Sequence, residues 1–373
     1  MIRFLLPALA ASACLAQAQT PPAPATLKDA YAPHFLMGAA LHTPIIVEHD
    51  HLARALIVPH FNSITPANAL KWGPFNPKPG VYEFGPVDAF VAYGEAHGMH
   101  LVGHTLFWHQ QTPAWVFQDD SGKRLTREAL LARMRERVDL LAKRYGARIH
   151  LWDVVNETYE DDGSLRKSPW TEILGEDFVR EAFRMSAEAF PADVKLIYND
   201  YSMFMPGRRD AVVRMVKDLQ ARGIRIDGVG MQGHWSVEGP TIEAIEEAIL
   251  AFAATGVRLH ITELDVDVLP RSKDMFGADL NKRAKRTAEN DPYTAGLPPD
   301  MQEKLAKRYA EIFALLVKHA DKIDRVTFWG VTDGDSWLNN FPVRGRTNHP
   351  LLFDRQNNPK PALDAALGAA KAK

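Results

Sequence analysis

Short apolar runs alternate with longer amphipathic segments along the chain from residue 35 onward. Each apolar run is six to ten residues long, and such runs are typical of strands buried on both faces, because a half-exposed strand would alternate apolar and polar side chains. The predicted strands cover residues 35–41, 62–68, 100–108, 148–157, 195–200, 227–234, 258–266 and 325–333.

Helical patterns separate and follow these strands at residues 49–60, 86–98, 126–145, 176–190, 207–222, 240–255, 301–319 and 360–371. Buried strands that alternate with helices indicate a parallel sheet covered by helices. Eight such repeats favour a closed (β/α)₈ TIM barrel, a single α/β domain, over an open doubly wound sheet. No glycine-rich phosphate-binding motif follows the first strand.

A TIM barrel carries its active site at the carboxyl ends of its strands. The predicted strands have polar or aromatic residues at those ends, and the side chains should therefore converge on one face of the barrel. They are Asn68, Lys71, His104, Trp108, Asn156, Glu157, Asn199, Asp200, Gln232, His234, Glu263, Asp265 and Trp329.

The first 27 residues have a different character from the repeats. Arg3, the apolar run FLLPALAASACLA and the small residues Ala16 and Ala18 predict a signal peptide over residues 1–18, too short to span a bilayer. Residues 19–27 form a proline-rich spacer, and residues 28–373 form the folded domain. The protein should therefore be exported, either secreted or periplasmic.

Cys14, the only cysteine, lies inside the predicted signal, so the exported form would contain no disulfide. The sequence ASAC before it also fits a weak lipoprotein signal, and an outer-membrane lipoprotein anchored at Cys14 remains an alternative. The formal net charge of -2 gives no basic excess for binding nucleic acid. We expect a monomer.

Two glutamates, Glu157 in DVVNE and Glu263 in ITELD, end apolar strands on opposite sides of the predicted barrel. A facing pair of carboxyls suits glycoside hydrolysis, in which one protonates the leaving oxygen and the other attacks or activates water. An ionised Glu263 would raise the pKa of Glu157 by like-charge repulsion and keep it protonated near neutral pH.

The stretches ITPANALKW, GHTLFWHQQTPAW, WDVVNET, GMQGHW, ITELDV and FWGVTDGDSW resemble, in this order, those of glycoside hydrolase family 10, the retaining endo-β-1,4-xylanases. The resemblance covers residues 28–371. It implies that Glu157 is the general acid/base and Glu263 the nucleophile, with carboxyls ~5 to 5.5 Å apart. It also implies that Asn156 contacts the sugar 2-hydroxyl and that His234 pairs with Glu263 and Asp265.

The same resemblance implies which side chains hold the sugar. Polar groups contact sugars on the non-reducing side of the cut, indoles form apolar walls, and Trp337 crowds the space that the hydroxymethyl group of glucose would need. The implied substrate-binding residues are Asn68, Lys71, His104, Trp108, Gln111, Gln232, Trp329 and Trp337. No cofactor or metal is implied, and the chain has no HExxH motif.

Two features depart from the family pattern. Ala67 stands where the family usually has a glutamate, which removes an acceptor for the second sugar on the non-reducing side. The connection over residues 267–300 is long and contains the basic cluster from Asn281 to Arg286, NKRAKR. At the rim of the cleft this cluster would attract acidic groups of glucuronoxylan, although a solvated turn without a ligand is the simpler interpretation.

Two other functions remain open on the sequence alone. A retaining β-glucanase or cellulase would use the same barrel and carboxyl pair, and would be distinguished by activity on carboxymethylcellulose without activity on xylan. A non-catalytic polysaccharide-binding protein would keep the cleft and have no hydrolytic activity.

Overall fold

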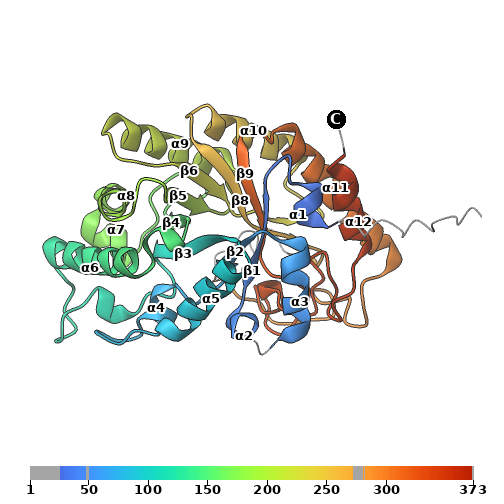
Figure 1. Ribbon diagram of the computed structural model, residues 1–373, viewed down its shortest axis with the longest axis horizontal. Helices are drawn as coiled ribbons and strands as arrows, with labels where there is room; N and C mark the ends of the chain where they lie inside the picture. Colours follow the sequence, from blue (N-terminus) through green and yellow to red (C-terminus); the bar gives the residue numbers. More distant parts are fainter. Residues whose placement is uncertain (1–25, 48–49, 272–279, 281, 372–373) are drawn as a thin grey trace, which may run out of the picture.

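The computed structural model describes residues 26–47, 50–271, 280 and 282–371. The predicted signal peptide, its Cys14 and most of the spacer lie outside these residues. Strands occupy the centre of the molecule and the long helices surround them (Figure 1). The strands are β1 (Leu36–Leu41), β2 (Ser63–Pro66), β3 (His100–Trp108), β4 (Leu151–Asn156), β5 (Lys195–Asp200), β6 (Gly228–Met231), β7 (His234–Ser236), β8 (Arg258–Asp267) and β9 (Ile323–Phe328).

The sheet is a closed parallel barrel. Its strand order is β6-β5-β4-β3-β2-β1-β9-β8, and pairing between β6 and β8 closes the ring. The short β7 pairs only with the end of β8 and lies outside the ring of eight. The predicted (β/α)₈ barrel is confirmed.

Long helices follow the strands and cover the outside of the barrel (Figure 1). They are α3 (His51–His60), α5 (Phe84–Ala96), α6 (Arg127–Tyr145), α8 (Asp177–Ala189), α9 (Pro206–Ala221), α10 (Ile242–Ala253), α11 (Pro299–Lys318) and α12 (Pro361–Ala369). Each long helix overlaps a predicted one. Among the described residues, no helix combines the length and apolar character needed to cross a bilayer.

Short helices were not predicted, since four to six residues are too few to establish a helical period. They are α1 (Leu27–Ala30), α2 (Thr43–Ile46), α4 (Trp72–Phe75) and α7 (Pro169–Leu174), with single 3₁₀ turns at Ala114–Val116, Gly146–Arg148 and Trp337–Asn339.

Two predicted strands were wrong at their carboxyl ends. The strand predicted over residues 227–234 breaks after Met231, where Gly233 adopts a left-handed conformation with φ of 83°. The strand predicted over 325–333 ends at Phe328. The amides of Val331 and Thr332 then donate to the Asp335 carboxylate and no longer take part in the sheet. Both breaks lie at the end of the barrel where its active site is expected.

The inside of the barrel contains both apolar and polar side chains. Val102, Leu151 and Ile197 form a small buried cluster in the lower barrel. Side chains two residues further along a strand point to the same side. At these positions His104 Nδ1 and Asp153 Oδ2 form a hydrogen bond of 2.8 Å. Buried His260 and Arg325 also lie inside the barrel, so polar groups are not confined to the carboxyl ends of the strands.

Candidate active site

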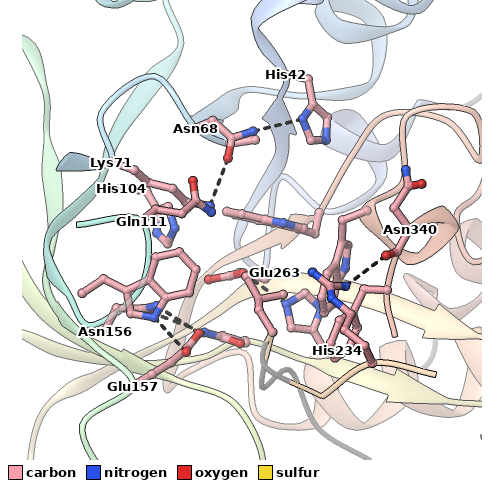
Figure 2. A pocket seen from close by; sticks show the side chains of 18 residues that line it. His42, Asn68, Lys71, His104, Gln111, Asn156, Glu157, His234, Glu263 and Asn340 are labelled. Carbon is pink, nitrogen blue, oxygen red and sulfur yellow. Dashed lines mark hydrogen bonds and ion pairs between the residues drawn. The ribbon is translucent and has the colours of Figure 1, made fainter. Parts of the chain in front are cut away.

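A cavity of about 300 Å³ opens at the carboxyl ends of the barrel strands. Glu263 lies near its centre in the view of Figure 2, between the Asn156 and Glu157 side and the His234 side. Twelve of the thirteen predicted site residues line the cavity, and Asp265, the thirteenth, contacts His234 from behind. The twelve are Asn68, Lys71, His104, Trp108, Gln111, Asn156, Glu157, Gln232, His234, Glu263, Trp329 and Trp337.

Glu157 is the first residue beyond β4, and its backbone is left-handed with φ of 59°. This conformation is uncommon for a residue other than glycine and costs about 1 to 3 kcal/mol, so the surroundings must hold it. The Glu157 amide donates to the Asn199 carbonyl at 3.0 Å, and its carbonyl accepts from Arg166 Nε at 3.0 Å. These two bonds turn the side chain out of the strand and into the cavity.

The Glu157 carboxyl accepts three hydrogen bonds. Trp108 Nε1 donates to Oε2 at 2.8 Å, while Gln232 Nε2 and Asn156 Nδ2 donate to Oε1 at 2.9 and 3.1 Å. The residue is only 4% exposed. The orientation of the carboxyl is therefore fixed before any ligand arrives.

The pKa of Glu157 is raised to about 7, chiefly by burial and next by the negative charge of Asp200. The bonds from Gln232 and Trp108 lower the pKa in part, and Glu263 adds a smaller upward contribution. The sequence predicted a raised pKa but attributed it to Glu263. The structure corrects the cause, because burial and Asp200 outweigh Glu263.

Glu263, on β8, has a lowered pKa, in contrast to the raised pKa of Glu157. Asn199 Nδ2 donates to its Oε1 at 2.7 Å, and His234 Nε2 lies 3.1 Å from its Oε2. Burial alone would raise its pKa, but the His234 bond and nearby positive charges, Lys71 among them, lower it below the ordinary value. Glu263 is therefore ionised at a pH where Glu157 keeps its proton.

His234 lies between two carboxylates, with Nε2 facing Glu263 and Nδ1 3.0 Å from Asp265 Oδ1. Burial would lower its pKa, but Asp265 and Glu263 raise the pKa to about 9. Trp337 Nε1 donates to the other Asp265 oxygen at 2.7 Å. At neutral pH the His234 imidazolium thus supplies the positive charge that stabilises ionised Glu263.

Two amides connect the glutamates across the cavity. Asn199 Nδ2 donates to Glu263 and also to Asn156 Oδ1 at 2.9 Å, while Asn156 Nδ2 donates to Glu157. Asn199 Oδ1 accepts from Thr262 Oγ1 at 2.6 Å, which fixes the orientation of the side-chain amide. Gly230 leaves the necessary space, since a Cβ there would lie 2.6 Å from Asn199 Oδ1.

Lys71 is a second buried cation in the wall of the cavity, besides the His234 imidazolium. Its Nζ donates to Asn68 Oδ1 at 3.2 Å and lies 4.8 Å from the ring centroid of Trp108 and 5.9 Å from that of Trp329. Burial lowers its pKa to about 8, while Glu263 and Glu157 oppose that shift. Lysine, amide and indoles together form a wall with hydrogen-bond donors and flat apolar faces, which suits a sugar ring.

The cavity also contains residues that the sequence did not assign to the site. They are His42, Leu280, Asn340 and Phe341. Arg283, which belongs to the basic cluster expected at the rim of the cleft, also lines the cavity. His42 directly follows β1, so the rule that identified the other strand ends would have found it. Asn340 and Phe341 follow no strand, and their place depends on how the segment after β9 folds back.

Asn199 and Asp200 were noted at the end of a strand but given no role. Asn199 bridges the two glutamates, and Asp200 is a buried charge near Glu157. Among the described residues, no three His, Cys, Asp or Glu side chains are grouped so that they could hold a metal ion.

The geometry presents one protonated and one ionised carboxyl to the same cavity. Carboxyls whose pKa values are displaced in opposite directions can divide the roles of acid and of nucleophile or base. Cleavage of a glycosidic bond requires this division.

Comparison with known proteins gives the same class of chemistry. Residues 26–369 match glycosyl hydrolase family 10. An endo-1,4-beta-xylanase A of Xylanibacter ruminicola is 43% identical over 338 residues, or 91% of each chain. An endo-1,4-beta-xylanase of Geobacillus stearothermophilus is 40% identical over 341 residues, covering 91% of this chain and 96% of the relative.

A solved structure of a GH10 endoxylanase retrieved from a sugarcane soil metagenome superimposes with a TM-score of 0.87. It is 48% identical, and the match covers 93% of this chain and 99% of that one. A xylanase XynB structure from Paenibacillus barcinonensis has a TM-score of 0.83 at 37% identity, covering 94% of this chain and 100% of the other.

Asp200→Asn should lower the pKa of Glu157, because it removes a negative charge that opposes ionisation of that carboxyl. Glu157 would then lose its proton at a lower pH than in the unaltered protein. Carbon-13 NMR titration of labelled glutamate measures the change.

Asp161→Asn is the matched control for this experiment. Asp161 and Asp200 are both ion-paired with Arg208 at 3.0 Å, but Asp161 is largely exposed and is not among the main causes of the Glu157 shift. An equal fall of the pKa in both variants would show that the effect passes through Arg208, and would contradict a direct influence of Asp200.

Proposed function

The chain belongs to glycosyl hydrolase family 10, and we propose that it is an endo-1,4-β-xylanase that cleaves internal β-1,4 bonds of xylan or xylo-oligosaccharides with retention of anomeric configuration. The observation that carries this proposal is the pair of buried glutamates, linked through Asn156 and Asn199, whose pKa values are displaced in opposite directions.

In the first step Glu157 donates its proton to the glycosidic oxygen while Glu263 attacks the anomeric carbon. The bond from carbon to the leaving oxygen breaks, and a covalent ester forms between the sugar and Glu263. Ester formation removes the negative charge of Glu263. Since that charge is one cause of the raised pKa of Glu157, its loss favours ionised Glu157.

In the second step ionised Glu157 takes a proton from water, and the oxygen of that water attacks the same anomeric carbon. The ester bond breaks, Glu263 leaves as a carboxylate and Glu157 regains its proton. Two displacements on one carbon restore the starting configuration, which is the basis of retention.

Asn156 and His234 have supporting roles in this proposal. Asn156 contacts the sugar 2-hydroxyl through a bond that strengthens in the transition state. His234, held by Asp265, keeps Glu263 ionised and oriented. Both roles rely on side chains that already have partners at each polar end, so they are positioned before the substrate binds.

The walls of the cavity suit xylose. Lys71, His104, Asn68 and Gln111 supply polar groups on the non-reducing side, and Trp108 and Trp329 flank the Lys71 ammonium. Trp337 is fixed by its bond to Asp265 and by stacking on Phe341 at 4.7 Å. A rigid indole in this place has little freedom to make room for the hydroxymethyl group that distinguishes glucose from xylose.

Export fits a polymeric substrate, which does not enter cells. We propose that residues 1–18 direct export, with a lipid anchor at Cys14 as the alternative, and that the mature protein is monomeric. Mass spectrometry of the mature N-terminus distinguishes cleavage after Ala18 from lipidated Cys14.

Hydrolysis of linear xylohexaose should release the β-anomer first, because retention of a β-linkage gives a β-hemiacetal. Proton NMR during the first minutes detects the anomer before mutarotation mixes it, and chromatography should show internal cleavage. Initial release of the α-anomer would contradict the two-step mechanism. Failure to cleave xylohexaose at all would contradict the proposed activity.

The two glutamates should respond differently to the leaving group. Glu157→Gln should lower kcat/KM on xylo-oligosaccharides by about 10²- to 10⁴-fold but should still release dinitrophenolate rapidly from an aryl xylobioside, since that group leaves without a proton. Glu263→Gln should lose both activities, because no nucleophile remains. A burst of dinitrophenolate from the Glu263 variant would show that the roles are assigned wrongly.

Ala67→Glu should strengthen binding of the second sugar on the non-reducing side. Ala67 lines the cavity, is 1% exposed and packs with Ala40 and Trp329. One added hydrogen bond is worth about 0.5 to 1.5 kcal/mol. Short linear oligosaccharides should therefore be cleaved more often in the binding register that places a sugar at this position. Ala67→Leu adds bulk without an acceptor and is the control. An unaltered product profile in Ala67→Glu would contradict the prediction.

A further inference from the structure

One cation at the rim of the cavity has no role in the proposed mechanism. Arg283 lies in the connection between β8 and α11 and is exposed, yet it lines the same cavity as the two glutamates. Its Nη1 donates to the backbone carbonyl of Asn340 at 3.1 Å, and its guanidinium lies 5.5 Å from the ring centroid of Phe341. These contacts fix its direction without neutralising its charge.

A continuous wall of side chains connects Arg283 with the nucleophile. The rings of His234 and Trp337 are 4.7 Å apart, and Trp337 stacks on Phe341 at 4.7 Å with 14° between the planes. Arg283 then packs on Phe341 and donates to the backbone carbonyl of Asn340, which Figure 2 labels at the edge of the cavity. A sugar chain bound against Trp337 would therefore have the guanidinium within reach of a side group.

The charge of this rim is strongly positive. Residues 267–271, 282–291 and 340–346 contain seven Lys and Arg residues against three Asp and Glu residues, whereas the whole chain has a formal charge of -2. The intervening residues 272–279 and 281 add one lysine and two aspartates by sequence, which leaves the segment positive. Such a local excess attracts anions from solution.

Most of the nearby cations already have an acidic partner or lie away from the cavity. Arg271 pairs with Asp267, and Arg286 pairs with Asp291 at 2.6 Å. Lys282 and Lys285 are exposed and do not line the cavity. Within the described part of the chain, Arg283 forms no ion pair, so its charge remains available to a ligand.

We propose that Arg283 is a specificity-determining residue that binds the carboxylate of a uronic acid side group on the xylan chain. A guanidinium presents several N–H donors in one plane and matches a carboxylate with two parallel hydrogen bonds, and Nη2 and Nε remain for this purpose. The inference rests on the proposed function, because it assigns a decoration of the same substrate to the same cleft.

The experiment compares three oligosaccharides of equal backbone length. One is linear, one contains a single glucuronic acid side group, and in the third that carboxyl is reduced to a primary alcohol. The quantity measured is the ratio of kcat/KM for each decorated substrate to kcat/KM for the linear one. Since the reduced substrate has the same bulk without the charge, it isolates recognition of the carboxylate.

In Arg283→Gln the ratio for the acidic substrate should fall about threefold to tenfold, as expected for loss of a partly exposed, charge-assisted contact. The ratio for the reduced substrate should change less than twofold. Arg283→Lys should restore part of the loss, because it keeps the charge without the planar pair of donors. Raising the salt concentration should lower the acidic ratio in the unaltered protein.

Lys285→Gln is the matched control, since it removes one positive charge from the same segment outside the cavity. Its ratios should equal those of the unaltered protein. An equal fall for Lys285→Gln would show general attraction by the rim and overturn a specific role for Arg283, and so would equal losses for acidic and reduced substrates. Absence of cleavage of the linear substrate would instead refute the proposed function.

Discussion

The organisation of the site depends on one electrostatic constraint, which is that two buried carboxyls share a single cavity. Both cannot be ionised there unless positive charge or hydrogen bonds compensate them. The fold meets this constraint asymmetrically. Glu263 has the His234 imidazolium beside it, whereas Glu157 has neutral donors beside it and the Asp200 charge nearby. The division of labour between the glutamates follows from these surroundings, since the two side chains are chemically identical.

The closed barrel is what brings these surroundings together. Glu157 follows β4 and Glu263 lies on β8, and their connecting amides and the supporting histidine come from β4, β5 and β7. Parallel strands in a ring end at the same edge, so residues far apart in sequence become neighbours. The early break of the strand after Met231 belongs to this arrangement, because it frees Gln232 and His234 to reach opposite glutamates.

The sequence predicted the barrel and most of the cavity because both follow from periodic signals. Buried strands read as apolar runs, and polar residues at their ends are recognisable one strand at a time. The sequence could not predict contacts that depend on three-dimensional proximity. Asp200 influences Glu157 only because β5 lies beside β4, and Phe341 reaches Trp337 only because the chain folds back after β9. The left-handed conformation of Glu157 had no signal, because it occurs at a residue other than glycine.

Gly230 has no functional group, yet it limits which residue can stand at position 199. The space left by its missing side chain is filled by the Asn199 amide that joins the two glutamates. A larger residue at 230 would displace that amide, and a smaller residue at 199 would leave a gap and remove the hydrogen bonds to Asn156, Glu263 and Thr262. Neither position can change alone without disturbing the other. In a set of homologous sequences, positions 199 and 230 on the neighbouring strands should therefore vary together.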